Sequence, residues 1–595
     1  PIGQWSPEAL LRLVREQAAE VLGHRDSSEL DVERAFRDLG FDSVTVVDLR
    51  RRLTQATGVK LSVASMFDHP SASAVALHLA RELGVTDDPT TSESAHVGRL
   101  RESEPLAVVG MACRLPGDID SPEGLWRLLD EGGEVVGPLP TNRGWDLSRF
   151  SADTSVAGTF NARGGSFLTH PEEFDAEFFG ISPREAITMD PQQRLLLEAS
   201  WEAIESAGIA PAELRGTDTG VFLGASYNDY GSRITAPSAE HEGYLALGSA
   251  SSVASGRVAY VFGLTGPALT IDTACSSSLA ALTVACQSLR DGTCSAALVG
   301  GVTVMSTMTT FIEFSRQRAG SEDGRCRAFS AEAAGAGWAE GVGVILIEPL
   351  SAALAAGHPV LGTIVGIAMN QDGASNGLTA PSGTAQAAVI RKALEDAGVA
   401  TSEVQAIEAH GTGTELGDPI EASALTAVYG AQRQAPLWLG SLKSNLGHTQ
   451  AASGLLSIIK VLLALSHERL PRTLHAEEPS PYIDWDETPL HLLQEPVPWP
   501  KNGRRVAGVS SFGISGTNVH VLIGDPPSGA LPECEPEEVP PATMPIPVVA
   551  AGSTAGSHRA RLEQLARLQD DPALHETART LARHAVGERR SVLLA

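Results

Sequence analysis

The sequence lacks any apolar run long enough to cross a membrane. Its best stretch, 454–465, is shorter than the ~18 residues that a membrane-spanning helix needs, and it contains Lys460. The first residues carry neither the charged nor the apolar segment of a secretory signal peptide. They also lack an initiator Met, which suggests a piece of a longer chain. We therefore expect a cytoplasmic protein without a membrane partner.

Cysteine is scarce, and basic residues are outnumbered by acidic ones. The six cysteines are scattered, with no CxxC pair and no dense disulfide framework, which fits a reducing cytosol. The chain has 44 basic and 72 acidic residues, a formal net charge of −28. Such a charge disfavours binding to a nucleic-acid backbone. We expect no nucleic-acid partner.

The length of the chain predicts more than one folding unit. Its 595 residues exceed the roughly 250–300 residues of one hydrophobic core. Hydrophobic residues make up 43% and charged residues 19%, which excludes disorder of the whole chain. Shifts in composition divide the chain into a helical block (1–85), a linker (86–104), a long block (105–525) and a short final block (526–595).

Residues 1–85 have the spacing of short helices. Ser6 and Pro7 are typical of a helix start, and apolar residues at helical spacing follow as far as Val21. Further helices are expected from about residue 42 to 58 and from 72 to 83. A bundle of about four helices fits this length.

The long block alternates short apolar runs with helical stretches. This alternation predicts a layered α/β architecture, and its length predicts two structural halves. The final block opens on a Pro-rich, acidic segment (526–547). A strand, an Arg-rich helix and a second strand are expected after it, as the start of a unit that continues. The apolar runs of the long block are 106–109, 221–223, 268–271, 342–347, 438–439 and 519–522.

Ser43 lies at a turn that leads into the second predicted helix. A phosphate ester is favoured at a helix N-terminus, although such a serine can also be a simple helix cap. Its context, Gly40-Phe41-Asp42-Ser43 followed by Met66-Phe67-Asp68-His69-Pro70, resembles an acyl carrier protein of a modular polyketide synthase over residues 6–84. The resemblance implies a 4′-phosphopantetheine arm on Ser43, attached by a phosphopantetheinyl transferase.

Cys275 follows an apolar strand and precedes a predicted helix. A thiol at a helix N-terminus has a lowered pKa, which favours the nucleophilic thiolate, and the backbone N–H groups there can stabilise an oxyanion. An apolar-flanked cysteine can also be an inert core residue. We assign that role to Cys286 and Cys294.

Two histidines stand in tight turns with small neighbours. His410 lies in a Gly/Thr-rich turn after a strand, and His448 precedes a helix, with Lys443 five residues before it. Both look exposed to a shared cavity. The glycines after His410 do not have the GxGxxG spacing of a phosphate-binding loop, so no nucleotide is expected.

Together these motifs resemble the β-ketoacyl synthase of type I polyketide synthases. The resemblance implies a thiolase-like fold with α-β-α-β-α layers, two similar halves and a homodimer. With the carrier bundle and a small α/β linker subdomain at the C-terminus, the chain would be multidomain. The matching segments are 104–111, 178–185, 189–194, 370–373, 510–513 and 516–520.

The resemblance also implies roles for individual residues. Cys275 matches the acyl-accepting nucleophile. His410 and His448 match the pair that promotes decarboxylation. Lys443 matches the lysine that organises those histidines, with Glu421 as its ion-pair partner. Burial and the charge of Lys443 should keep both imidazoles neutral.

The remaining implied features concern the loop near the end of the long block. The N–H groups of Cys275 and Ile514 would form the oxyanion hole, and Phe512 would belong to a gating loop, 512–515. The reaction implied by the resemblance needs no metal.

The resemblance predicts polyketide chain translocation and elongation. Cys275 would take an acyl chain from a carrier thioester, and a malonyl-type thioester would then condense with that chain after losing CO2. Downstream acyltransferase and carrier domains are expected partners. The alternative is a docking module that passes chains on without condensation. A serine hydrolase is disfavoured: the G-x-S-x-G pattern occurs once, at 373–377, directly beside the 370–373 segment that matches the ketosynthase family.

Overall fold

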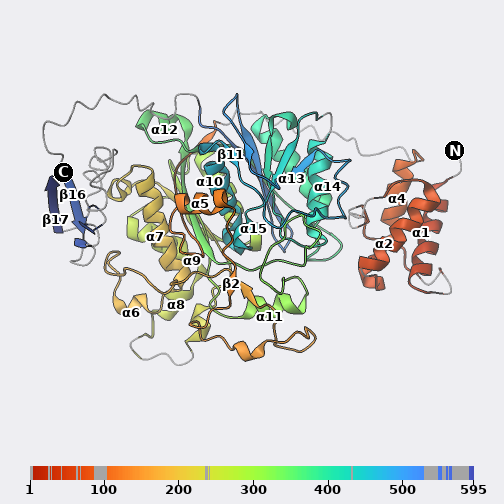
Figure 1. The fold of residues 1–595 in the computed structure, drawn as a ribbon, viewed down its shortest axis with the longest axis horizontal. Coiled ribbons are helices and arrows are strands. Elements are labelled where there is room, and N and C mark those ends of the chain that lie inside the picture. Colours follow the sequence, from red (N-terminus) through yellow and green to blue (C-terminus); the bar gives the residue numbers. More distant parts are fainter. Residues whose placement is uncertain are drawn as a thin grey trace.

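A computed structural model describes three parts of the chain (Figure 1). They are residues 5–85 except 25–26, 28–29, 42, 62–64 and 67–68; residues 104–527 except 235–238, 240 and 431–432; and residues 547–552, 558–559, 562–563, 565 and 589–594. No helix in these described parts combines the length and apolarity of a membrane span.

The N-terminal block is a small helical bundle with its own core. Its described helices are α1 (Pro7–Val21), the 3-10 turn η2 (Phe36–Leu39), α2 (Ser43–Thr57) and α4 (Ala72–Glu82). Ser6 and Ser71 cap α1 and α4 by accepting backbone N–H groups of the first turn. The three predicted helices are confirmed. The core residues include Leu10, Val14, Leu49, Leu53 and Leu79.

The long block is built on one hydrogen-bonded sheet of 11 strands, in the order β12-β10-β9-β14-β15-β8-β1-β7-β6-β4-β5. All six predicted apolar runs are strands of this sheet. The strands are β1 (Leu106–Arg114), β4 (Gly220–Ala225), β5 (Ala268–Ile271), β6 (Ala297–Thr303), β7 (Gly341–Pro349), β8 (Gly362–Gln371), β9 (Ala406–Glu408), β10 (Leu437–Gly440), β12 (Leu490–Leu492), β14 (Val506–Phe512) and β15 (Thr517–Gly524).

The sheet consists of two halves with the same pairing pattern. In β1-β7-β6-β4-β5 the first two pairings are antiparallel and the next two are parallel, and β8-β15-β14-β9-β10 repeats that pattern. The halves are joined where β1 pairs with β8 over only three residues, Leu106 to Val108. The prediction of two structural halves is confirmed.

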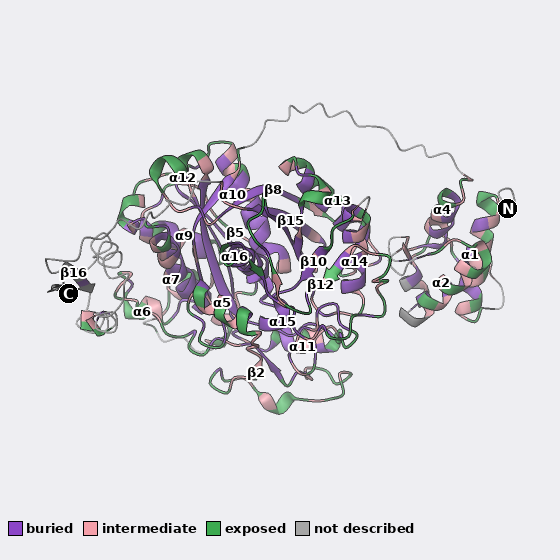
Figure 2. Cartoon of the chain, turned by 45° about the horizontal axis from the view of Figure 1, so that its top comes forward, coloured by how far each residue is buried: buried purple, intermediate pink, exposed green. Residues whose placement is uncertain are grey.

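Helices cover both halves and fill the space between them (Figures 1 and 2). α7 (Pro191–Ser206) and α9 (Ser251–Phe262) contact the first half, and α13 (Gly383–Ala397) contacts the second. α10 (Ser277–Arg290) and α16 (Ser453–Ser466) contact strands of both halves. The result is the expected α-β-α-β-α layering. The other α-helices of this block are α5 (Pro122–Glu131), α6 (Pro183–Ala186), α8 (Leu245–Ser249), α11 (Thr309–Arg316), α12 (Leu350–Ala356), α14 (Gly417–Tyr429) and α15 (Lys443–Leu446).

The two central helices begin at equivalent places. A 3-10 turn, η6 (Ala274–Ser276), leads into α10 after β5, and η8 (Gln450–Ala452) leads into α16 after β10. The two turns contact each other. Each starts on a non-glycine residue with positive φ, Ala274 at 56° and Gln450 at 48°. The N-terminal ends of two buried helices therefore meet in the middle of the molecule.

The final block contributes an antiparallel pair, β16 (Pro547–Gly552) and β17 (Arg589–Leu594). Both expected strands are thus confirmed. Most of the expected Arg-rich helix lies outside the described residues. Short strand pairs complete the fold: β2 (Gly137–Pro138) with β3 (Gly164–Gly165), and β11 (Arg469–Leu470) with β13 (Val497–Pro498).

Close packing of α10 against α16 depends on Gly454. A Cβ atom at this position would lie 2.4 Å from Leu279 Cγ, a fully buried atom of α10. We expect Gly454→Ala to destabilise the protein by about 1–3 kcal/mol through overpacking. The matched control is Gly256→Ala in α9, where a Cβ meets nothing within 4 Å. Calorimetry should show a lower Tm for the first variant and no loss for the second, and equal Tm values would contradict the packing argument.

Candidate active site

Cys275 sits on the turn between β5 and α10, as predicted. Asp272 shapes this turn, because its carboxylate accepts the Ala274 N–H at 2.9 Å and the Ser226 hydroxyl at 2.8 Å. Two serine hydroxyls fix the Cys275 carbonyl. Ser511 of β14, in the second half of the sheet, donates to it at 2.8 Å, and Ser453 of α16 donates to it at 3.3 Å. Cys275 is therefore fixed where the two halves meet.

Folding brings Cys275, His410 and His448 together. The Sγ atom and one ring nitrogen of each histidine lie within 4.8 Å of one another. All three side chains line one cavity of about 290 Å³, together with Trp338 and Phe512. The prediction that the fold gathers these three side chains is confirmed.

The protonation of His448 is set by a backbone contact. Its Nδ1 accepts the N–H of Gln450 at 3.2 Å, so the proton of the neutral ring resides on Nε2. Nε2 is buried and has no hydrogen-bond partner among the residues that the structure describes. His448 can therefore donate a hydrogen bond from Nε2 to a bound molecule, and its ring is held by stacking on Trp338 with centroids 5.7 Å apart.

His410 follows β9 and faces His448 edge to face, with ring centroids 5.5 Å apart. Its backbone N–H donates to Glu421 at 2.8 Å, which fixes the turn. The Phe512 ring lies 5.6 Å from the His410 ring. This contact connects the histidine to the segment predicted to be a gating loop.

Both imidazoles are electrically neutral at physiological pH. Burial lowers the pKa of His410 and of His448 well below 6.5, and the charge of Lys443 lowers the pKa further. Both predicted causes are confirmed. Neutral imidazoles retain one N–H donor each without attracting an anion to the site.

The expectation of a lowered thiol pKa at Cys275 is wrong. Burial raises the pKa of this thiol to about 11, and this effect outweighs three opposing ones: the charge of Lys443 and the N–H groups of Ile514 and Cys275. The helix N-terminus is present, but the thiol has lost too much hydration. The resting form is therefore the thiol. The two N–H groups are those predicted for the oxyanion hole, and each acts to lower the pKa of the thiol.

Glu421 and Lys443 influence each other electrostatically, since each shifts the pKa of the other. The Glu421 carboxylate accepts two backbone N–H groups, from His410 at 2.8 Å and from Gly411 at 2.9 Å. Burial raises its pKa, although these N–H bonds and the nearby Lys443 oppose that rise. Glu421 acts on the site by holding the His410 turn. The ion pair with Lys443, which the resemblance implies, stays a prediction.

Sequence reasoning missed the charged pair behind the site. Glu408, at the end of β9, forms a buried ion pair with Lys460 of α16 at 2.6 Å. Glu408 also raises the pKa of Lys443, which burial lowers. Asp418 was missed as well, and it accepts the N–H groups of Phe329 and Gly413. Lys460 interrupting an apolar helix was the available signal, since a buried charge needs a partner.

Ser43 is the first residue of α2, in agreement with the predicted turn into a helix. This 15-residue helix places partial positive charge at the Ser43 end, which suits a phosphodiester. Gly40, three residues earlier, has φ of 98°, a backbone conformation that favours glycine. The backbone at Ser43 thus fits attachment of a phosphopantetheine arm.

Cys275, His410 and His448 also have the chemical composition of a metal site. Tetrahedral zinc would need its ligand atoms about 3.3–3.8 Å apart. The three ligand atoms lie within 4.8 Å of one another, a limit that is looser than this spacing. We assign no metal to the site.

Family models match the chain in four segments. The phosphopantetheine attachment site matches residues 12–79, the N-terminal and C-terminal domains of β-ketoacyl synthase match 103–353 and 361–477, and the ketoacyl-synthetase C-terminal extension matches 479–590.

Solved structures agree with these matches. The oxazolomycin ketosynthase domain OzmH KS7 of Streptomyces albus is 34% identical with a TM-score of 0.75, covering 82% of this chain and 86% of that one. The module 6 ketosynthase of the Bacillus subtilis bacillaene synthase is 32% identical with a TM-score of 0.74, covering 83% of each chain. The chain belongs to the β-ketoacyl synthase family of type I modular polyketide synthases. It combines a ketosynthase with a phosphopantetheine-binding carrier.

Longer polyketide synthases contain the same arrangement. The spectinabilin polyketide synthase system protein NorA' of Streptomyces orinoci is 52% identical over 593 residues, which is 98% of this chain and 16% of that protein. Erythronolide synthase EryA2 of Saccharopolyspora erythraea is 52% identical over 581 residues, 97% of this chain and 16% of the relative. This ketosynthase chain spans about a sixth of their length.

The raised thiol pKa has a direct chemical consequence. Alkylation of Cys275 by iodoacetamide requires the thiolate, so its rate should rise about tenfold for each pH unit and reach no plateau below pH ~10. Peptide mapping by mass spectrometry gives the rate at Cys275, and glutathione under the same conditions is the control. A plateau at pH 6–7 would instead indicate a stable thiolate.

Proposed function

We propose that the ketosynthase takes an acyl chain from the carrier arm on Ser43 and extends it by decarboxylative condensation. The observation that carries this proposal is that His448, whose Nε2 has no hydrogen-bond partner among the described residues, lines one cavity with Cys275. When bound, the phosphopantetheine arm supplies the thiol that carries the acyl group as a thioester.

The first half-reaction is acyl transfer to Cys275. Its sulfur loses a proton and attacks the thioester carbonyl, forming a new C–S bond while the old C–S bond breaks. The departing thiol takes up a proton. The N–H groups of Cys275 and Ile514 would hold the transient oxyanion, since both already favour negative charge on the sulfur by lowering its pKa. The raised thiol pKa means that deprotonation accompanies attack rather than preceding it.

The second half-reaction is condensation with a malonyl-type thioester. His448, and His410 beside it, would donate hydrogen bonds to the thioester oxygen, which stabilises the enolate left when the C–C bond to the carboxylate breaks and CO2 departs. The enolate carbon then attacks the acyl carbonyl on Cys275, and the C–S bond breaks. Neutral imidazoles suit this role because each retains an N–H donor and carries no charge that would attract an anion to the site.

The proposed partners follow from this chemistry. A phosphopantetheinyl transferase would modify Ser43, and downstream acyltransferase and carrier domains would supply the extender unit. A homodimer is supported by β5, which lies at the edge of the sheet with Leu269 44% exposed and Tyr260 of the adjoining α9 85% exposed. An unpaired edge strand flanked by apolar side chains is suited to pairing with a second copy.

Variants at the cavity should separate the two half-reactions. With a small acyl thioester as donor, Cys275→Ala should take up no acyl group, whereas His448→Ala should still be acylated. With a malonyl-loaded carrier added, His448→Ala should lose about 10²–10⁴-fold in CO2 release and β-ketoacyl product. Intact mass and product analysis measure the two steps.

Two results would contradict this assignment. Covalent acylation of the ketosynthase in Cys275→Ala would remove the nucleophile from its proposed role. Acylation of the unmodified protein without CO2 release would favour the alternative, a module that passes chains on without condensation.

A further inference from the structure

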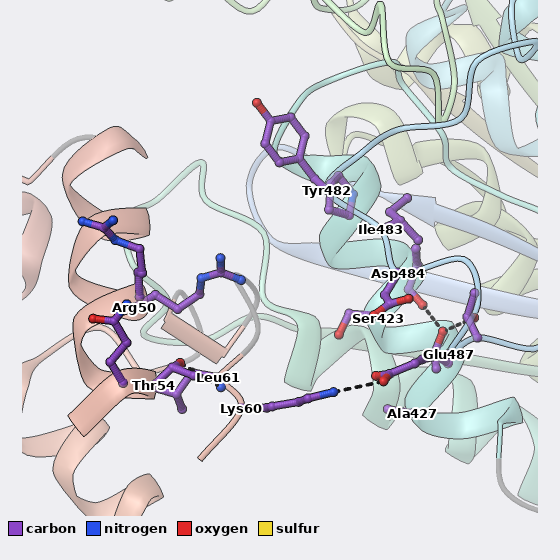
Figure 3. Close-up of a pocket in the computed structure, with 16 residues that line it drawn as sticks. Arg50, Thr54, Lys60, Leu61, Ser423, Ala427, Tyr482, Ile483, Asp484 and Glu487 are labelled. Atoms are coloured by element: carbon purple, nitrogen blue, oxygen red, sulfur yellow. Dashed lines mark hydrogen bonds and ion pairs between the residues drawn. The ribbon is translucent and has the colours of Figure 1, made fainter. Parts of the chain in front are cut away.

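Carrier and ketosynthase face each other across a gap of about 790 Å³ (Figure 3). The carrier side is the C-terminal half of α2 and the segment that follows it. The ketosynthase side is α14 and the loop 482–488. Figure 1 also places α2 beside α14. This gap is lined by residues of opposite charge on its two sides.

The carrier presents a basic surface, which consists of Arg50, Arg51 and Lys60. The ketosynthase presents an acidic surface, which consists of Asp484 and Glu487. Opposite charges of this kind steer two surfaces together and fix their orientation.

Lys60 makes the direct contact between the two surfaces. Its Nζ lies 3.1 Å from Glu487 Oε1. The hydrogen bond and charge of Glu487, with a smaller effect of Asp484, raise the pKa of Lys60. Arg50 has no ion-pair partner among the described residues, and Arg51 pairs only with Asp48 of its own helix, at 2.6 Å. Arg50 is therefore available to strengthen a closer contact.

Helix α14 connects the acidic surface to the active site. Pro419, Ala422, Ser423 and Thr426 follow one face of α14 and line the gap. Thr426 holds the acidic loop through a 2.6 Å hydroxyl contact with Thr488. The first turns of the same helix carry Gly417, Asp418 and Glu421 into the cavity of Cys275.

The basic surface lies toward the other end of α2 from Ser43. Ser43 begins α2, and Arg50 follows seven residues later, about 10 Å along the helix axis. The contact is made through the far end of α2 and Lys60. It thereby holds the carrier without occupying the end that bears the arm.

We propose that the acidic surface of Asp484 and Glu487 is the docking site for the basic surface of this chain's own carrier during acyl transfer to Cys275. The proposal rests on the proposed function. The contact is loose, since the Lys60 and Glu487 side chains are 84% and 65% exposed. A weak, electrostatic contact suits a carrier that must leave after each transfer.

The test is a charge swap in the full chain. The Ser43 arm is loaded with an acyl group, and transfer to Cys275 is followed by rapid quench and peptide mass analysis. Lys60→Glu and Glu487→Lys should each slow transfer about three- to tenfold at low ionic strength. The double variant should recover to within about twofold of the unmodified protein, because the pair is re-formed with reversed polarity.

Matched control variants distinguish the effect of the charges at the gap from the effect of the chain's overall charge. Arg12→Glu on the exposed face of α1 and Glu395→Lys on the exposed face of α13 make the same changes away from the gap and should leave transfer unchanged. Every variant should accept an acyl group from a small thioester at the normal rate, since that donor needs no docking. This readout shows that the Cys275 cavity is intact.

The outcomes distinguish the docking site from the proposed function. Unchanged transfer in the single variants, or a double variant slower than both, would overturn the docking site while leaving the transfer reaction in place. A rate that rises in proportion to chain concentration would assign the surface to the carrier of another molecule and would also overturn it. Failure of the unmodified chain to transfer at all would overturn the proposed function itself.

Discussion

Removal of the His410 and His448 rings from water is the constraint on which this site depends. Burial keeps both imidazoles neutral, and the Gln450 N–H that occupies His448 Nδ1 leaves the ring proton on Nε2. The same burial holds Cys275 as a thiol. One physical cause thus determines the charge state of all three groups, and the charge that remains nearby is that of buried lysines and carboxylates.

The duplicated architecture explains how three distant residues meet. Cys275 lies on the turn before α10, and His448 lies just before the equivalent turn that leads into α16. Those two turns contact each other between the two halves of the sheet. His410 arrives from the end of β9 in the second half. The site therefore lies where the two similar halves of the fold meet. It requires both halves to be packed around α10 and α16.

Much of the framework could be predicted from the sequence. The runs 106–109 and 342–347 are apolar and bounded by turn residues, so they identified strands, and Ser6 and Pro7 marked a helix start. Motifs around Cys275, His410 and His448 identified the site. The thiol pKa could not be predicted, because it depends on how much water the fold excludes, and sequence shows the helix N-terminus but not the burial.

Other features could not be predicted, because they depend on contacts between segments that are distant in the sequence. The contact of Glu421 with the His410 and Gly411 N–H groups depends on how α14 approaches that turn. The positive φ at Ala274 has no signal in the sequence, since alanine does not favour that conformation. The opposing charges of Lys60 and Glu487 are 427 residues apart, and only the fold brings them together.

The most direct test of this account is the protonation state of His448. Nitrogen-15 NMR of histidine-labelled protein, assigned with a His448→Gln variant, reports both the charge and the tautomer of each ring. The account predicts a neutral His448 with its proton on Nε2 at pH 6.5, where an ordinary histidine is about half protonated. A charged imidazolium at that pH, or a proton on Nδ1, would contradict it.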